Sequence, residues 1–327
     1  MTFIKRFAKH KKPLAGVLRL LQFFSFCFIF LFIASLTAVF FIAGCRQEVT
    51  PEPVEPPKVQ APKLEPPKVQ ARPTVSFHDK CADILTNYVD EEGMVDYKTL
   101  KRKRFDLKKL LDEFDNLDRE LYNSWPQEDK IAFWLNAYNI QMLKIIVDNY
   151  PIESSRIYRL FWPPTSIRHI KDIWNKYKFV VMDEEFTLAE IEKRLFRQEF
   201  DEPRIFFALS QASISSPPLR NEPYYGHRLY EQLDHQVKKF LADTQGFRID
   251  RYDKTVYLSA ILQPTWFGRE FFSKYGTDKK FKDQQPPTRA VLNFITNYIS
   301  EHDIAFLEVQ NYSIKYMKYD WRLNDGS

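Results

Sequence analysis

The longest uncharged stretch of the chain lies near its N-terminus and decides where the rest of the protein folds. Residues 20–44 are 25 consecutive positions without a charge, and the clearly polar side chains among them are Gln22, Ser25, Ser35 and Thr37. As a helix this run is about 37 Å long, which exceeds a hydrocarbon core of about 30 Å. Cationic residues precede it, so the positive-inside rule predicts a cytoplasmic N-terminus and an extracytoplasmic location for everything after residue 45.

Two forms of membrane attachment fit this run. It ends in Ile42-Ala43-Gly44-Cys45, which resembles the lipobox of bacterial lipoproteins, where the signal peptide is removed before a cysteine that becomes lipidated. Cys45 is then the lipid attachment site. The apolar region of a secretory signal is usually about 7–15 residues long, so this longer run also fits an uncleaved transmembrane helix. Either form makes residues 1–45 a membrane anchor, in contact with lipid, that holds the rest of the chain in the periplasm or at the cell exterior.

Residues 46–75 have the composition of a linker. Eight prolines lie between positions 51 and 73, and the segment from Glu55 to Ala61 recurs unchanged from Glu65 to Ala71. Proline fixes φ and removes amide donors, so we expect an extended spacer of about 70 Å rather than a folded element. A spacer is also favoured over a ligand for proline-reading modules.

The charge of the chain argues against nucleic-acid binding. Six cationic residues before position 20 account for more than the net charge of +5, and subtracting them leaves −1 for residues 20–327. A nearly neutral folded part gives no support to binding of a phosphate backbone. The only cysteines are Cys27, Cys45 and Cys81, and the histidines are scattered, so no metal site is predicted. No cofactor is predicted either, because phosphate-binding glycine loops are absent.

Residues 76–327 are expected to form one globular domain of the α+β class, rich in helices and with short strands and hairpins. Apolar residues at helical spacing predict helices over 77–89 and 107–114, with Cys81 in the core, and a long buried helix opened by Pro126. Strands are predicted for 179–182 and 204–209, a hairpin across Asp253-Lys254, and closing strands between 305 and 316. Further helices are predicted after the capping box Thr187 to Glu190, over 227–241 and over 289–299.

Several of these stretches resemble one family, the domain-of-unknown-function family 547 of bacteria and plants, in an order that covers residues 77–324. They are Tyr88-Val89-Asp90 with Gly93, Val95-Asp96-Tyr97, Ile131 to Asn139, Leu188 with Ile191-Glu192, Pro203-Arg204-Ile205, Ser216 to Arg220, Val256 to Ser259, and Tyr319 to Asn324. The resemblance implies a domain rather than a reaction, since no activity is generally assigned to the family. Its members often carry His at the position of Phe206 and Cys at those of Gln211 and Ser216. These departures weaken any transfer of mechanism.

Five polar residues are candidates for ligand binding: Asn136, Asn139, Glu192, Arg204 and Arg220. Asn136 and Asn139 are three positions apart on the buried helix, where they either bind a ligand or tie neighbouring loops to the core. Glu192 either acts as a catalytic carboxylate or forms an ion pair with an arginine such as Arg204 or Arg220.

Ser216, Glu192 and His227 are the candidates for catalysis. Ser216 precedes two prolines and is predicted to cap a helix that begins at Pro217. A serine nucleophile needs a base, and His169, His227 and His235 have no spacing that identifies a triad. Catalysis is therefore the second hypothesis, as a hydrolase or transferase with a serine or carboxylate centre.

The first hypothesis is a binding domain of the cell envelope that takes an envelope or extracellular ligand or partner. It draws on the spacer, the near-neutral charge, and aromatic residues in predicted loops, namely Trp162, Trp174, Tyr224, Tyr225, Trp266 and Phe267. The oligomeric state is not indicated by the sequence.

Overall fold

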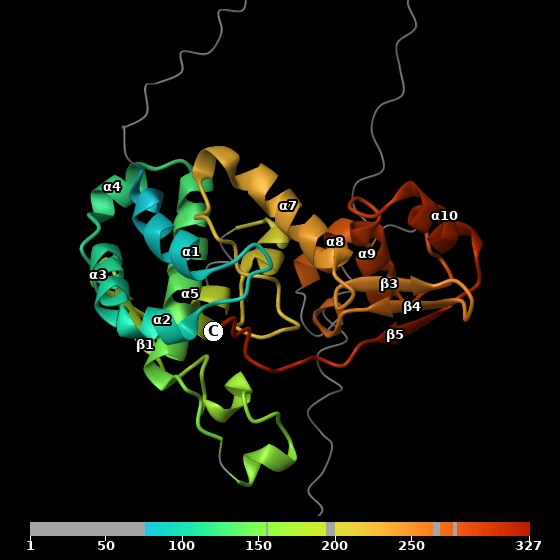
Figure 1. Ribbon diagram of the computed structural model, residues 1–327. Helices are drawn as coiled ribbons and strands as arrows, with labels where there is room; N and C mark the ends of the chain where they lie inside the picture. The colour runs from blue at the N-terminus through green and yellow to red at the C-terminus, as the bar shows by residue number, and fades with distance from the viewer. Residues whose placement is uncertain (1–75, 155, 194–199, 264–268, 277–279) are drawn as a thin grey trace, which may run out of the picture. The chain divides into compact units, whose positions relative to one another are not determined.

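A helix that is apolar nearly all round forms the centre of the fold. It is α5 (Gln127–Asn149) of the computed structural model, which describes residues 76–154, 156–193, 200–263, 269–276 and 280–327 (Figure 1). Pro126 is its N-cap residue, and Glu128 and Asp129 lie in the first turn, where their charges complement the helix dipole. From Ile131 to Val147 every side chain except that of Lys144 is buried, which confirms the predicted central helix.

Shorter helices surround α5 and share its hydrophobic cluster. These are η1 (Phe77–Cys81), α1 (Ala82–Tyr88), α2 (Tyr97–Arg102), α3 (Arg104–Asp115) and α4 (Arg119–Ser124), where η marks a 3-10 helix. The helices predicted from the spacing in 77–89 and 107–114 are confirmed. Cys81 is fully buried among them, and burial raises the pKa of its thiol, so it is a core residue as predicted.

A small hairpin and three helical turns follow α5. The turns η2 (Tyr158–Leu160) and η3 (Ile167–His169) precede β1 (Lys178–Val181), which pairs antiparallel with β2 (Glu184–Thr187). Thr187 and Glu190 form the predicted capping box at the start of α6 (Leu188–Glu190). The helical turn continues through residue 193, and the predicted helical residues Leu195 and Phe196 lie outside the described residues.

A second hydrophobic cluster is built from the C-terminal third of the chain. Its sheet has the order β3 (Phe247–Asp250), β4 (Thr255–Leu258) and β5 (Ser313–Tyr316), in which β3 and β4 are antiparallel and β4 and β5 are parallel. Its helices are η7 (Ala260–Leu262), α8 (Arg269–Tyr275), α9 (Pro286–Ile295) and α10 (Glu301–Val309). The hairpin predicted across Asp253-Lys254 is confirmed.

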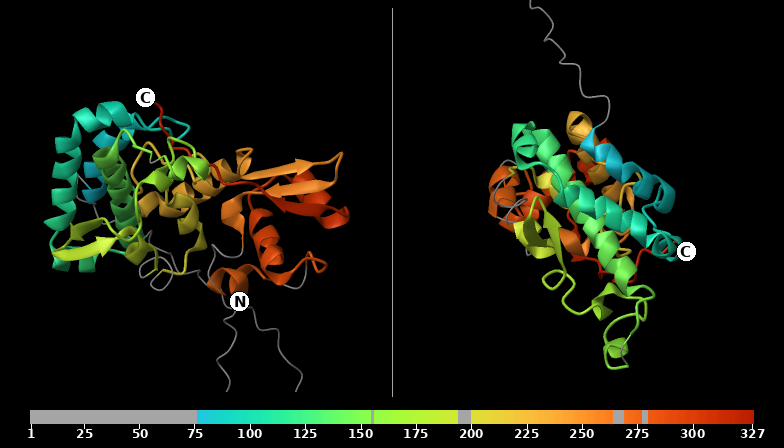
Figure 2. Two further views of the ribbon diagram at one scale, coloured as in Figure 1. Left: turned by 90° about the horizontal axis from the view of Figure 1, so that it is seen from below. Right: turned by 90° about the vertical axis from the view of Figure 1, so that its left-hand side faces the viewer.

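One helix joins the two clusters. α7 (Leu229–Ala242), preceded by η6 (Gly226–Arg228), places Leu229 and Leu233 in the cluster of α5. One to three turns later it places Val237, Phe240 and Leu241 in the second cluster. Figure 2 shows the sheet β3–β5 at the end of the fold opposite α3. The polar side of α7 is therefore held at the junction of the two cores.

Three predicted elements are wrong. The segment predicted as a buried strand at 204–209 is the 3-10 helix η5 (Pro203–Ala208), because Pro203 occupies a favourable first position and the Glu202 carboxylate accepts the Arg204 N–H at 3.1 Å. Residues 305–309 belong to α10, capped by Ser300, rather than to a strand. Ser216 caps no helix, since 217–225 are non-helical; Pro218 disfavours the helical conformation at Pro217.

The described residues combine helices with short strands, which confirms the α+β class. The predicted anchor, Cys45 and the proline-rich linker lie in residues 1–75, outside the described ranges. Within those ranges no helix has both the length and the apolar character needed to cross a membrane.

Candidate functional site

Asn136 and Asn139 bind backbone groups of two distant loops. The Asn136 side chain donates to the Tyr224 carbonyl and accepts the Tyr224 N–H, both at 2.9 Å. Asn139 donates to the Ala208 carbonyl and accepts the Ser210 N–H, both at 3.0 Å. Both amides are buried. Each asparagine therefore fixes one loop on α5. Asn136 holds the segment just after Arg220, and Asn139 holds the segment just before Ser216.

Glu192 and Arg204 lie in separate polar contacts. The Tyr138 hydroxyl donates to Glu192 at 2.6 Å, and burial together with the charge of Glu192 raises the pKa of Tyr138. Arg204 forms ion pairs with Glu202 and Asp234 instead of Glu192. These contacts hold η5 against α7, so Arg204 is part of the packing of the fold.

The Ser216 hydroxyl is directed at backbone carbonyls. It donates to Ser213 O at 2.9 Å, and Pro217 O is a second acceptor at 3.2 Å. No histidine of the described ranges forms a hydrogen bond with the Ser216 hydroxyl. His227 is exposed and lies beside the Tyr225 ring. The predicted catalytic candidates Ser216, Glu192 and His227 are thus not brought together as a nucleophile and its base.

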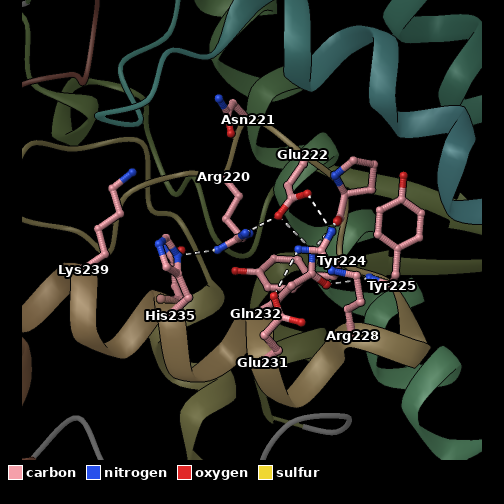
Figure 3. A network of polar contacts seen from close by, with 12 residues as sticks. Arg220, Asn221, Glu222, Tyr224, Tyr225, Arg228, Glu231, Gln232, His235 and Lys239 are labelled. Carbon is pink, nitrogen blue, oxygen red and sulfur yellow. Dashed lines mark hydrogen bonds and ion pairs between the residues drawn. The ribbon is translucent and has the colours of Figure 1, made fainter. Parts of the chain in front are cut away.

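Arg220 lies at the centre of a polar network between the segment 219–228 and α7. Figure 3 shows its guanidinium between Glu222 and His235, with Lys239 one turn further along the helix. Arg220 forms an ion pair with Glu222 and donates to His235 Nδ1 at 3.0 Å. We call Arg220, Glu222, Arg228, Gln232, His235 and Lys239 the Arg220 network.

The network is held in register by the loop contacts of Asn136 and Gln232. Gln232 is buried, donates to Pro223 O and accepts the Tyr225 N–H, both at 2.8 Å. Together with the Asn136 bonds to Tyr224, these contacts fix three consecutive residues after Glu222. The positions of Arg220 and Glu222 therefore depend on α5 and α7 together.

The charges of the network change one another's pKa. Burial raises the pKa of Glu222, but hydrogen bonds from Arg220 and Gln232 outweigh it and lower the pKa overall. The pKa of His235 is lowered, most strongly by burial and to a smaller extent by the positive charges of Arg220 and Lys239. Because Arg220 can only donate, Nδ1 of His235 accepts and the ring is the neutral tautomer with its proton on Nε2. Such a histidine is a poor general base.

Lys239 connects this network to a pocket of about 150 Å³. Burial and the charge of Arg220 lower the pKa of its ammonium, which donates to the Glu91 carbonyl. The pocket is lined by Glu92, Gly93, Met94, Ser213 to Ser216, Pro218, Lys239, Phe240, Asp243, Gln245 and Asn324. Ser216 thus lies on the wall of this pocket, and Arg220, a candidate predicted separately, lies next to the pocket.

The floor of the pocket is made where three parts of the chain meet. Ile214 and Ser215 donate their N–H groups to the carbonyls of Arg322 and Asp320, at 2.9 and 3.3 Å. Asn324 donates to Gly93 O and accepts from the Tyr97 hydroxyl, both at 2.9 Å. Three of the stretches that resemble the family, those beginning at Tyr88, Ser216 and Tyr319, therefore converge here.

Two buried polar atoms beside the pocket have no hydrogen-bond partner among the described residues. They are Arg220 Nε and Gln236 Oε1, and the Gln236 amide nitrogen donates to Pro218 O on the pocket wall. Buried polar atoms are nearly always paired, and neither of these two residues lines the pocket, so bound water is the simplest partner for both atoms.

A larger groove of about 600 Å³ lies between α1 and α3. Its walls carry solvated charges, and its closest ion pair, Lys80 to Glu113 at 2.7 Å, is about 40% exposed on each side. Such surface pairs contribute little to specific recognition. Among the described residues, no three His, Cys, Asp or Glu side chains gather as a candidate metal site.

The sequence prediction missed Lys239, Glu222 and Gln232. Gln232, His235, Gln236 and Lys239 recur at helical spacing and form a polar stripe on α7, along one edge of its apolar face. Two glutamines of that stripe are buried, and only the structure shows this.

Residues 122–241 match the family described as "Protein of unknown function, DUF547". The matched range contains α5, Ser216 and the whole Arg220 network. No curated protein and no solved structure matches the chain. The family match supports the resemblance seen in the sequence, and the description of that family assigns no activity.

Proposed function

We propose that this chain is a membrane-tethered extracytoplasmic protein whose folded part binds a small polar ligand in the pocket beside Lys239. The observation that carries the proposal is the position of the Lys239 ammonium. It lies on the pocket wall next to Arg220, and its one acceptor among the described residues is the Glu91 carbonyl. An ammonium has three N–H donors, so two remain for an anionic group of the ligand.

The other polar groups at the pocket complement a ligand that also has donors. Glu92 and Asp243 are exposed carboxylates at its lining, and both accept hydrogen bonds. A carboxylate or phosphate toward Lys239, with hydroxyl or amino groups toward Glu92 and Asp243, satisfies both sides. The small volume restricts the bound part to a fragment about the size of a single ring.

Binding is favoured over catalysis by the hydrogen-bond directions. The Ser216 proton is donated to backbone carbonyls, and His235 has its Nδ1 lone pair occupied by Arg220. A hydrolase with a serine centre needs the reverse arrangement, in which a histidine accepts from the serine hydroxyl.

Lys239 and its neighbour Lys238 provide a matched test of the pocket. Thermal unfolding is measured with acetate, glycine and inorganic phosphate as probes, for wild type, Lys239→Met and Lys238→Met. A probe present at ten times its Kd stabilises by about 1.4 kcal/mol, which raises Tm by about 3–6 °C. Lys239→Met should lose this shift, and Lys238→Met, which removes an exposed charge one position away, should keep it. Equal shifts in all three proteins would exclude the pocket as the binding site.

The tether has its own test. Metabolic labelling with a palmitate analogue should label wild type and not Cys45→Ala if Cys45 is lipidated. Membrane retention without label favours the uncleaved helix of residues 20–44. Recovery of the intact, unlabelled chain away from membranes would remove both forms of attachment.

A further inference from the structure

Four large apolar side chains are exposed within one short segment after α5. Ile157, Tyr158, Leu160 and Phe161 are 69%, 50%, 81% and 70% exposed. They make up nearly half of the large exposed hydrophobic side chains of the described residues, and the others are dispersed. Single exposed apolar residues are ordinary, but a contiguous group marks an interaction surface.

The same segment is cationic. Residues 154–171 contain Arg156, Arg159, Arg168 and Lys171 and no acidic residue. All four side chains are exposed. Apolar tips surrounded by cations are complementary to a surface that offers hydrocarbon below a layer of negative charge.

Backbone hydrogen bonds and a cation–ring contact tie the base of the segment to Trp321 and Leu323. The Ile167 N–H donates to Trp321 O, and the Leu323 N–H donates to Thr165 O. The Arg168 guanidinium lies over the rings of Trp162 and Trp321, at 4.8 and 5.0 Å from their centroids. Figures 1 and 2 show the segment, in yellow-green, as a lobe that projects from the end of α5 away from the other helices. We call residues 156–162 at its tip the docking loop.

We propose that the docking loop inserts into the headgroup layer of an anionic phospholipid membrane and holds the folded part against it. A projecting tip exposes side chains around its whole circumference, which a fluid lipid surface contacts more fully than a flat protein face does. Tyr158, which is exposed, is of a residue type that favours the membrane–water interface. Arg156 and Arg159 reach phosphate groups while Leu160 and Phe161 enter the acyl boundary.

The membrane concerned is the one that holds the proposed tether, and in this respect the inference rests on the proposed function. The linker composition predicts a reach of about 70 Å. A folded part of about 250 residues has a radius of gyration of about 18 Å. The linker is therefore long enough for any face of the folded part to turn to the bilayer, and the docking loop selects one face.

The test is hydrogen exchange of the full chain mixed with vesicles. Amide exchange of residues 156–162 is compared on phosphatidylcholine alone and on phosphatidylcholine mixed with phosphatidylglycerol. We expect exchange to be slowed about tenfold or more on the anionic vesicles and much less on the neutral ones. The β3–β4 turn around Tyr252, which is 96% exposed, is the internal control and should not change.

Three variants separate the contributions. Leu160→Ser with Phe161→Ser should abolish the slowing, and Arg156→Gln with Arg159→Gln should abolish its dependence on anionic lipid. Tyr252→Ser removes an exposed aromatic side chain elsewhere and should have no effect. The proposal is overturned if the docking loop is not slowed on either lipid, which would point to a protein partner, or if the slowing is unchanged in Leu160→Ser with Phe161→Ser.

Failure of the tether gives a different result. A chain that does not sediment with vesicles of phosphatidylcholine lacks the tether, whatever its docking loop does on anionic lipid. A chain that sediments with both vesicles but shows no slowing keeps the tether and loses the docking loop.

Discussion

Asn136 is expected to stabilise the fold by holding one loop on α5, and replacing it by alanine tests this directly. In Asn136→Ala the N–H and the carbonyl of Tyr224 both lose their side-chain partner. Tyr224 is buried, so water does not reach these groups without opening the loop. A buried backbone group without a partner costs about 1–3 kcal/mol. Two such groups predict a loss of about 2–6 kcal/mol, a large part of the about 5–15 kcal/mol typical of a folded protein.

The assay is urea denaturation of the full chain in a mild non-ionic detergent, followed by near-ultraviolet circular dichroism. Asn116→Ala is the matched control, because Asn116 is exposed and its amide donates, among the described residues, to the Asp112 carbonyl alone. Its effect should stay within about 0.5 kcal/mol. Asn136→Asp keeps an acceptor for the Tyr224 N–H but places a carboxylate oxygen at the Tyr224 carbonyl, so it should destabilise at least as much as alanine. A loss below about 1 kcal/mol in Asn136→Ala would refute the reasoning.

Two further outcomes follow from the site. The pKa of Glu222 is lower in the folded protein than its ordinary value of 4.5, so its contribution to stability is complete above that pH and is lost as the pH falls through the folded pKa. Urea unfolding of wild type and Glu222→Gln at neutral and acidic pH should show a difference that shrinks on acidification, and a constant difference contradicts this origin. Gly93 has φ +86°, and a Cβ there would lie 2.8 Å from Leu219 N, so Gly93→Ala should lower Tm by several degrees. Gly326→Ala, whose nearest contact would be 3.2 Å, should change Tm less, and equal effects of the two substitutions would remove the argument from backbone conformation.

The elements predicted well are those whose spacing is long enough to define a period. α5 and α3 repeat apolar residues over several turns, and Thr187 to Glu190 supplies two reciprocal hydrogen bonds that the sequence encodes locally. Residues 204–209 are a short apolar run, and a run of this length fits either a strand or a 3-10 helix. The difference is made by Glu202 and Pro203, which lie just before the run.

The sequence predicts individual residues of the candidate site but not their partners. Asn136 and Asn139 were identified as buried amides with two possible roles, but their partners lie 88 and 69 residues further along the chain. Ser216 and Arg220 were identified by residue type, and the capping role of Ser216 is wrong. Lys239 is an ordinary helical lysine in sequence, and it becomes distinctive only where α7 brings it to the pocket. Long-range packing, which no local pattern records, decides these positions.

One extended segment near Trp321 ties three parts of the fold together. The segment from Asp320 to Asp325 bonds to residues near Val95, Thr165 and Ser215, which are otherwise far apart in sequence. Each of these contacts closes a long loop of the chain, and the conformational entropy of that loop must be lost before the contact forms. Docking of the segment from Asp320 to Asp325 is therefore expected to be a late step in folding, which brings the three parts of the chain together at once.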